Sequence, residues 1–127
     1  MIHKNYLLLF SIVFFSFSCS MNRPFSKRLL GNYQGTQEEY SIKIDDKRII
    51  IPADQFNANL SYDELIIKNA RRVQKASYTI KATTKEFYSL EVLFEDGTIE
   101  NWRLYKKGKK LERMEANPRP STILLKN

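Results

Sequence analysis

The residues Phe87–Tyr105, FYSLEVLFEDGTIENWRLY, are the most informative part of the sequence for the fold. Apolar and polar residues alternate on both sides of Glu95-Asp96-Gly97, a pattern typical of two strands joined by a tight turn. A three-residue loop with a left-handed glycine opposes Leu90 with Trp102. A two-residue turn would oppose Leu90 with Arg103, and a slip of one residue moves every side chain to the other face. The patterning therefore favours the three-residue loop.

This register has consequences for both faces of the hairpin. We expect one inner face made of apolar side chains, namely Tyr88, Leu90, Val92, Phe94, Trp102 and Leu104. The outer face is polar but also carries Phe87, Leu93, Ile99 and Tyr105, which indicates partial cover on that side too.

Period-two alternation continues elsewhere in the chain. Tyr40, Ile42 and Ile44 share one face of a second hairpin, whose turn we expect at residues 45–48, with Ile44 opposite Ile49. Further strands are predicted at 77–83, 110–115 and 122–126, with a loop at 117–120.

Residues 61–73 are ambiguous. Ser61 and Glu64 have the spacing of a capping box, which favours one short helix. The run Leu65-Ile66-Ile67 is short and rich in β-branched residues, and Asn69-Ala70 can turn the chain, so a strand hairpin is favoured. About seven to nine short strands must close on themselves to remove their edges, which predicts a small all-β antiparallel barrel or a sandwich.

Composition limits the class of protein. The chain has 127 residues, 43% of them hydrophobic and 28% charged, which fits one globular domain. A single cysteine excludes an intrachain disulfide, and one Cys with one His excludes a Cys/His zinc cluster.

The first 18 residues have the pattern of a signal peptide. Lys4 precedes an apolar run from Tyr6 to Phe17, which is too short to span a bilayer as a helix. Ser16 and Ser18 form a small-x-small cleavage pattern, with cleavage expected after Ser18 and directly before Cys19, the one cysteine. Ordinary cleavage to a secreted protein with a free thiol, and an uncleaved anchor, are the alternatives.

The sequence Ser16-Phe17-Ser18-Cys19 resembles the lipobox of bacterial lipoproteins of the Bacteroidetes type. The resemblance implies that Cys19 becomes the acylated N-terminus, carrying palmitate-like chains, and that residues 19–28 form a tether. The segment 20–23 lacks the acidic residues that mark surface export in such lipoproteins. We therefore expect a protein anchored in a cell-envelope membrane, the outer membrane on its periplasmic face.

Charge is the next constraint on partners. Without residues 1–18, 20 basic side chains face 14 acidic ones. An exported protein does not usually meet nucleic acid, so no nucleic-acid partner is expected. Arg23, Lys27 and Arg28 lie near the expected anchor and hence near lipid headgroups. The lysines around Gly108 are interpreted as a solvated turn.

Gly31-Asn32-Tyr33 is similar to the Gly-x-Trp motif that opens lipocalin-like domains, and Trp102-Arg103-Leu104 followed by a lysine-rich turn is similar to their ending. This resemblance implies that residues 29–127 form an up-and-down β-barrel with an apolar cup. It also implies a basic residue stacked on the floor aromatic, for which Arg103 and Arg113 are both candidates.

Chemistry-bearing motifs are scarce. His3 lies in the expected signal peptide and the thiol is expected to be acylated, so nucleophilic triads are not available. We expect no enzyme activity, cofactor or metal.

Two functions remain. In the first, the barrel binds a small apolar or amphipathic ligand in a cup lined by Tyr33, Tyr40, Tyr88, Leu90, Trp102 and Leu104. In the second, the interior is packed and the surface binds an envelope protein.

Overall fold

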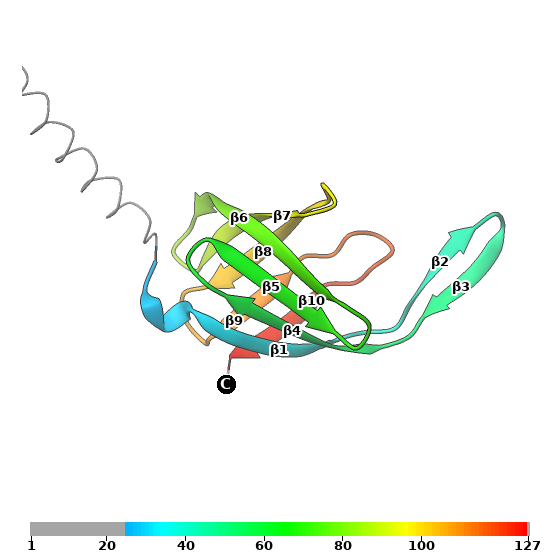
Figure 1. Cartoon of the computed structure of the whole chain (residues 1–127), viewed down its shortest axis with the longest axis horizontal. Coiled ribbons are helices and arrows are strands. Elements are labelled where there is room, and N and C mark those ends of the chain that lie inside the picture. The colour runs from blue at the N-terminus through cyan, green and yellow to red at the C-terminus, as the bar shows by residue number, and fades with distance from the viewer. Residues whose placement is uncertain (1–24, 127) are drawn as a thin grey trace, which may run out of the picture.

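The computed structural model describes residues 25–126, which form a closed barrel with a projecting hairpin (Figure 1). Eight strands close the barrel in the order β1-β10-β9-β8-β7-β6-β5-β4, and β2 and β3 form a separate two-stranded sheet. The elements are η1 (Lys27–Leu29), β1 (Gly31–Gln37), β2 (Tyr40–Ile44), β3 (Lys47–Ile51), β4 (Asp54–Leu60), β5 (Glu64–Asn69), β6 (Val73–Thr83), β7 (Phe87–Phe94), β8 (Ile99–Tyr105), β9 (Lys110–Arg113) and β10 (Thr122–Lys126). All pairings are antiparallel, so the predicted small up-and-down barrel is confirmed.

The projecting hairpin is an extension of the first hairpin of the barrel. β1 pairs with β4 up to Gln37↔Asp54, and beyond that point the same two chain segments pair again as β2 and β3. Pro52 lies in the interruption, where its missing N–H cannot serve a ladder. We call residues 40–51 the arm; it leaves the barrel at the end where β1 finishes (Figure 1).

The turn of the arm differs from the predicted one. Ile42 pairs with Ile49, and Ile44 pairs with Lys47 rather than with Ile49. Asp45 and Asp46 make a two-residue turn with φ of 51° and 62°. Short Asp side chains tolerate this conformation, and such turns match the twist of the strands. The predicted four-residue turn was wrong, but a shift of two residues preserves the face of every side chain.

The second hairpin has the predicted register. Leu90 pairs with Trp102, and Gly97 is left-handed with φ of 90°. The expected cover on its outer face was wrong for Leu93 and Ile99, which are exposed. The outer aromatics instead contact each other in a tilted arrangement, with the ring centroids of Phe87 and Tyr105 5.5 Å apart and an interplanar angle of 57°. Cations lie over those rings from the solvent side.

Residues 61–73 form strand and turn, so the helical alternative was wrong. β5 ends at Asn69, whose N–H donates to the carbonyl of Arg72 at 3.1 Å. Its side-chain oxygen accepts from the N–H groups of Arg71 and Arg72, both at 2.9 Å. This local hydrogen bonding is the usual reason for Asn in a turn. The favoured hairpin is therefore confirmed, since β5 pairs with β6, which begins at Val73 and continues through the strand predicted at 77–83.

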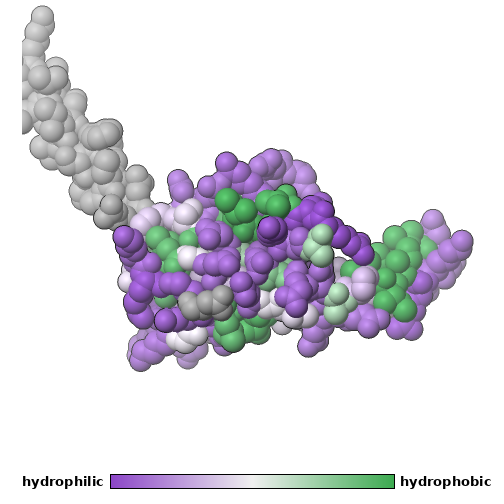
Figure 2. All heavy atoms as spheres, turned by 60° about the horizontal axis from the view of Figure 1, so that its bottom comes forward, coloured by the Kyte–Doolittle hydropathy of each residue, from purple (hydrophilic) through white to green (hydrophobic). Residues whose placement is uncertain are grey.

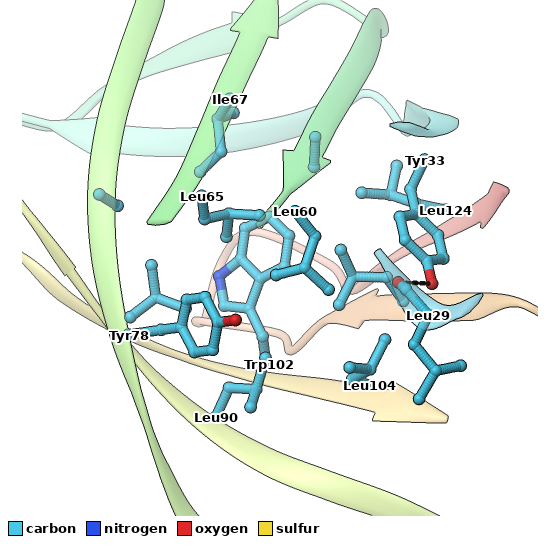
Figure 3. Close-up of a cluster of buried hydrophobic side chains, with 14 of the residues drawn as sticks. Leu29, Tyr33, Leu60, Leu65, Ile67, Tyr78, Leu90, Trp102, Leu104 and Leu124 are labelled. Carbon is cyan, nitrogen blue, oxygen red and sulfur yellow. Dashed lines mark hydrogen bonds between the residues drawn. The ribbon is translucent and has the colours of Figure 1, made fainter. Parts of the chain in front are cut away.

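The interior of the barrel is filled by side chains. Trp102, at its centre, is completely buried, and Leu65, Leu90, Leu104 and Tyr33 around it are completely buried as well (Figure 3). The inward side chains of every barrel strand contribute to this core. This core forms because side chains alternate between the two faces of each strand, so that every second residue points into the barrel.

One end of the barrel is closed by the segment that precedes β1. The centroid of the Phe25 ring lies 5.4 to 6.4 Å from the ring centroids of Tyr62, Tyr78 and Tyr88. Leu29 is buried in the same hydrophobic core. Phe25 therefore already packs on the barrel, although the sequence assigns it to the tether. The expected signal peptide, cleavage site and Cys19 lie outside the described residues. No helix within residues 25–126 has the length and apolar character that a membrane span requires.

Candidate functional site

The six residues predicted to line a cup do not come together around an open space. Tyr33, Leu90, Trp102 and Leu104 are completely buried in the core (Figure 3). Tyr88 is half-buried and packs against Phe25 at the closed end. Tyr40 is in the arm, outside the barrel wall. The interior residues therefore act as packing, and a ligand needs another place.

The aromatic residue expected at the barrel floor belongs to the closed end. The Tyr33 hydroxyl donates to the carbonyl of Leu29 at 2.6 Å, and burial raises the pKa of Tyr33 to about 12. The two candidate stacking cations lie over other rings: Arg103 over Phe87 at 4.6 Å and Arg113 over Phe56 at 4.9 Å. Tyr33 thus joins the entering chain to the core.

An open cavity of about 560 Å³ lies at the other end of the barrel, at the base of the arm. We call it the mouth. Four arginines line it, and the one acidic side chain of its lining is Asp54. The arginines come from the β5–β6 turn, from the end of β9 and from the loop before β10: Arg71, Arg72, Arg113 and Arg119. Pockets that bind small ligands have volumes in this range.

The mouth is built on an ion cluster. The Glu100 carboxylate accepts two hydrogen bonds from Arg113, at 2.7 and 2.8 Å, and one from Arg119 at 3.3 Å. The indole N–H of Trp102 donates to the same carboxylate at 3.0 Å. The three charged side chains are only 11 to 14% exposed. One carboxylate thus faces two guanidinium groups in a setting largely removed from water.

Electrostatics leave this cluster positive. Burial raises the pKa of the Glu100 carboxyl, but hydrogen bonds and charges from Arg113 and Arg119 outweigh it and hold the pKa below its usual value. Burial lowers the pKa of Arg119, and the charge of Arg113 lowers it further. Arginine remains protonated in proteins, so the cluster keeps one uncompensated positive charge. The Arg119 Nε is buried and has no hydrogen-bond partner.

The loop that carries Arg119 is held against β1. The Gln37 side-chain amide donates to the carbonyl of Pro120 at 3.2 Å, and the Thr122 hydroxyl donates to the Gln37 side-chain oxygen. The Arg119 guanidinium also donates to the carbonyl of Met114 at 3.0 Å. Buried hydrogen bonds of this kind fix a loop in one position, so Arg119 is preorganised at the mouth.

An apolar strip leads from the mouth along the arm. Tyr40 and Ile51 line the mouth and pair with each other across the arm. The next pair on the same face is Ile42↔Ile49, and Ile44 follows. Ile44 is 50% exposed and Ile49 41% exposed. The projecting hydrophobic surface is visible beside the barrel in Figure 2.

Sequence reasoning missed Glu100, Arg119 and the role of Arg113. A signal was present, because Glu100 alternates with Trp102 and Leu104 and therefore points inward. Arg113 likewise shares the inward face of β9 with buried Leu111. A charge in phase with an apolar face marks a buried ionic group. Arg119, between two prolines in a loop, offers no such signal.

Comparisons with protein-family models, with curated proteins and with solved structures find no match to this chain.

Proposed function

We propose that this protein is a membrane-tethered binding module whose barrel mouth takes a small amphipathic anion. In this proposal, acylated Cys19 anchors the protein to a cell-envelope membrane, on its periplasmic face. The observation that carries the binding role is the positively charged Arg113–Glu100–Arg119 cluster at an open cavity of about 560 Å³.

The chemistry of the mouth supports an anionic head group. A carboxylate or phosphate at the mouth would compensate the positive charge of the Arg113–Glu100–Arg119 cluster. Arg71 and Arg72 approach the same cavity from the β5–β6 turn and are exposed. Guanidinium groups bind planar oxyanions well because their donors form a fixed fork.

The apolar strip supports a hydrophobic tail. It begins inside the mouth at Tyr40 and Ile51 and continues to Ile44, four residues further along β2. Four strand residues span about 13 Å, enough for a medium-length acyl chain. Covering these exposed isoleucines removes apolar area from water, which is favourable at about 25 cal/mol per Å². The interior cup of the sequence-based hypothesis is thereby replaced by the mouth and the arm.

Trp102 provides a direct assay. It is the one tryptophan of the chain, and its N–H donates to the carboxylate that holds both arginines. We expect decanoate to change Trp102 fluorescence saturably, while decanol and decyltrimethylammonium have much weaker effects. Arg119→Gln should weaken decanoate binding about tenfold or more, because a charged hydrogen bond is lost.

Arg103→Gln is the matched control, since Arg103 lies over Phe87 on the outside of the barrel. It should leave decanoate affinity unchanged. An equal response to decanol and decanoate, or equal affinity in the Arg119→Gln variant, would refute an anion site at the mouth.

Protein binding is the second candidate function, and the arm favours it. A two-stranded hairpin alone is marginally stable in water, and the arm exposes isoleucines on both faces, with Ile50 60% exposed on the second face. An envelope protein that adds a strand or an apolar surface would complete it. Cross-linking in cells should then capture one dominant partner, and Ile44→Ser with Ile49→Ser should abolish that capture.

A further inference from the structure

Positive charge is concentrated at the closed end of the barrel. The segments at this end are residues 25–30, 61–63, 84–86 and 106–110, with Lys126 at the end of β10 (Figure 1). They carry two acidic side chains, Asp63 and Glu86, and eight basic ones: Lys27, Arg28, Lys85, Lys106, Lys107, Lys109, Lys110 and Lys126. The other described residues hold eleven basic and twelve acidic side chains. The net positive charge of residues 25–126 therefore lies entirely at this end.

Tertiary contacts join these basic segments into one surface. The Arg28 guanidinium donates to the carbonyl of Lys106 at 3.2 Å, and the Lys126 ammonium donates to the carbonyl of Arg28 at 2.7 Å. The N–H of Lys106 donates to the carbonyl of Glu86 at 2.9 Å, next to Lys85. Residues that are separated by 78 or by 98 positions in the sequence thus become neighbours. We call these eight side chains the basic face.

The charged side chains of the basic face are available to bind an external anionic group. Among ion pairs between described residues, none includes a member of the basic face. Lys27, Arg28, Lys85, Lys107 and Lys109 are exposed. Two members are held by aromatic rings rather than by carboxylates, with Lys106 over Tyr88 at 4.9 Å and Lys110 over Tyr105 at 4.0 Å. Cations fixed in this way keep their full charge.

We infer that the basic face docks on a bilayer that carries anionic headgroups. Basic side chains near such a surface each strengthen binding about fivefold, and their attraction falls off within a Debye length. The face surrounds the point where the described chain begins, at Phe25, which is six positions after Cys19. Docking at this end turns the mouth and the arm away from the membrane. The inference stands on charge and geometry and is independent of the ligand at the mouth.

Vesicle binding tests the inference. The chain from residue 19 onward, without the expected signal peptide and with Cys19→Ser so that it cannot be acylated, is mixed with vesicles of phosphatidylcholine alone or with added phosphatidylglycerol. We expect co-sedimentation to require phosphatidylglycerol and to decrease with salt. Lys85→Gln with Lys107→Gln should lower the partition coefficient about 25-fold, fivefold for each charge removed.

The matched control removes two charges at the tip of the arm, with Lys47→Gln and Arg48→Gln, both exposed. It should bind vesicles like the parent. Trp102 emission shows that each variant is folded, and decanoate titration separates this test from the mouth site. Equal losses in the two variants, or equal binding to both vesicle types, would overturn the inference. Capture by a short DNA duplex without vesicle binding would overturn it as well.

Discussion

Single charged residues set the electrostatics of the mouth. Glu100 sits on the inward face of β8 and compensates one of two buried guanidinium groups. A buried ion cluster is weak evidence for stability, because desolvation offsets much of the attraction. Removing one partner is costly, however, since the remaining charges stay buried. We therefore expect Glu100 to have opposite effects on folding and on the anion binding that we propose for the mouth.

We predict that Glu100→Gln lowers the free energy of unfolding at neutral pH by about 2 to 3 kcal/mol, less than for a fully enclosed pair because the mouth admits water. The same substitution should strengthen decanoate binding, since it removes the negative charge beneath the arginines. Urea unfolding and Trp102 titration measure the two effects. A variant as stable as the parent would show that the cluster is not buried in solution.

The difference in unfolding free energy between the parent and Glu100→Gln should depend on pH, because the pKa of Glu100 lies below its usual value. The folded pKa lies below the unfolded value of 4.5, so ionised Glu100 stabilises the fold above about pH 4.5. That contribution is lost as the pH falls through the folded pKa. The gap in unfolding free energy between the parent and Glu100→Gln should therefore narrow in acid. A gap that stays constant to strongly acid pH would contradict the assignment.

At the scale of elements, the barrel depends on the seam between its first and last strands. β1 pairs with β10 at Tyr33↔Lys126 and Gln34↔Leu125. Gly35 follows in β1, and a Cβ there would clash with the carbonyl oxygen of Ile123. This close approach requires a residue without a side chain.

We predict that Gly35→Ala destabilises the barrel by about 1 to 3 kcal/mol, because the added methyl group forces the backbone of β10 to move. The exposed neighbour Gln34 provides the control, and Gln34→Ala should change the free energy of unfolding by less than about 0.5 kcal/mol. Denaturant unfolding measures both. Equal stabilities of the two variants would mean that the seam is looser than the structure indicates.

At the scale of the whole molecule, the two ends of the barrel differ in structure and in charge. The closed end carries the basic face and the segment that leads from Cys19. The open end carries the mouth and the arm, which projects away from the barrel (Figure 1). The packed core between them acts as a rigid spacer, since its interior holds side chains rather than ligand.

The arm should be separable from the barrel. Replacing residues 38–53 by Asn-Gly joins Gln37 to its partner Asp54 through a tight turn. We expect the free energy of unfolding to change by less than about 0.5 kcal/mol, because the arm buries little apolar surface. Decanoate binding should weaken with loss of the apolar strip. Urea unfolding measures the stability, and titration followed by Trp102 fluorescence measures decanoate binding. A decrease of several kcal/mol in the free energy of unfolding would show that the arm and the barrel unfold as one cooperative unit.

The sequence pattern alone predicts the strands, their inward faces and the register of the hairpin at Phe87–Tyr105. These are local properties: side chains alternate with a period of two, and turn residues select the loop. It also implied closure, because so many short strands leave edges that must be paired. The turn at Asp45-Asp46 was misjudged because two turn lengths keep the same apolar face.

Only the closed barrel shows how the interior is filled, where the cavity opens and which charged side chains contact each other. Glu100 meets Arg119 across 19 positions, and Lys126 meets Arg28 across 98. No local pattern encodes such contacts, because they depend on how the closed sheet brings distant strand ends together. The basic face and the mouth are therefore properties of the closed barrel, not of any one segment of the chain.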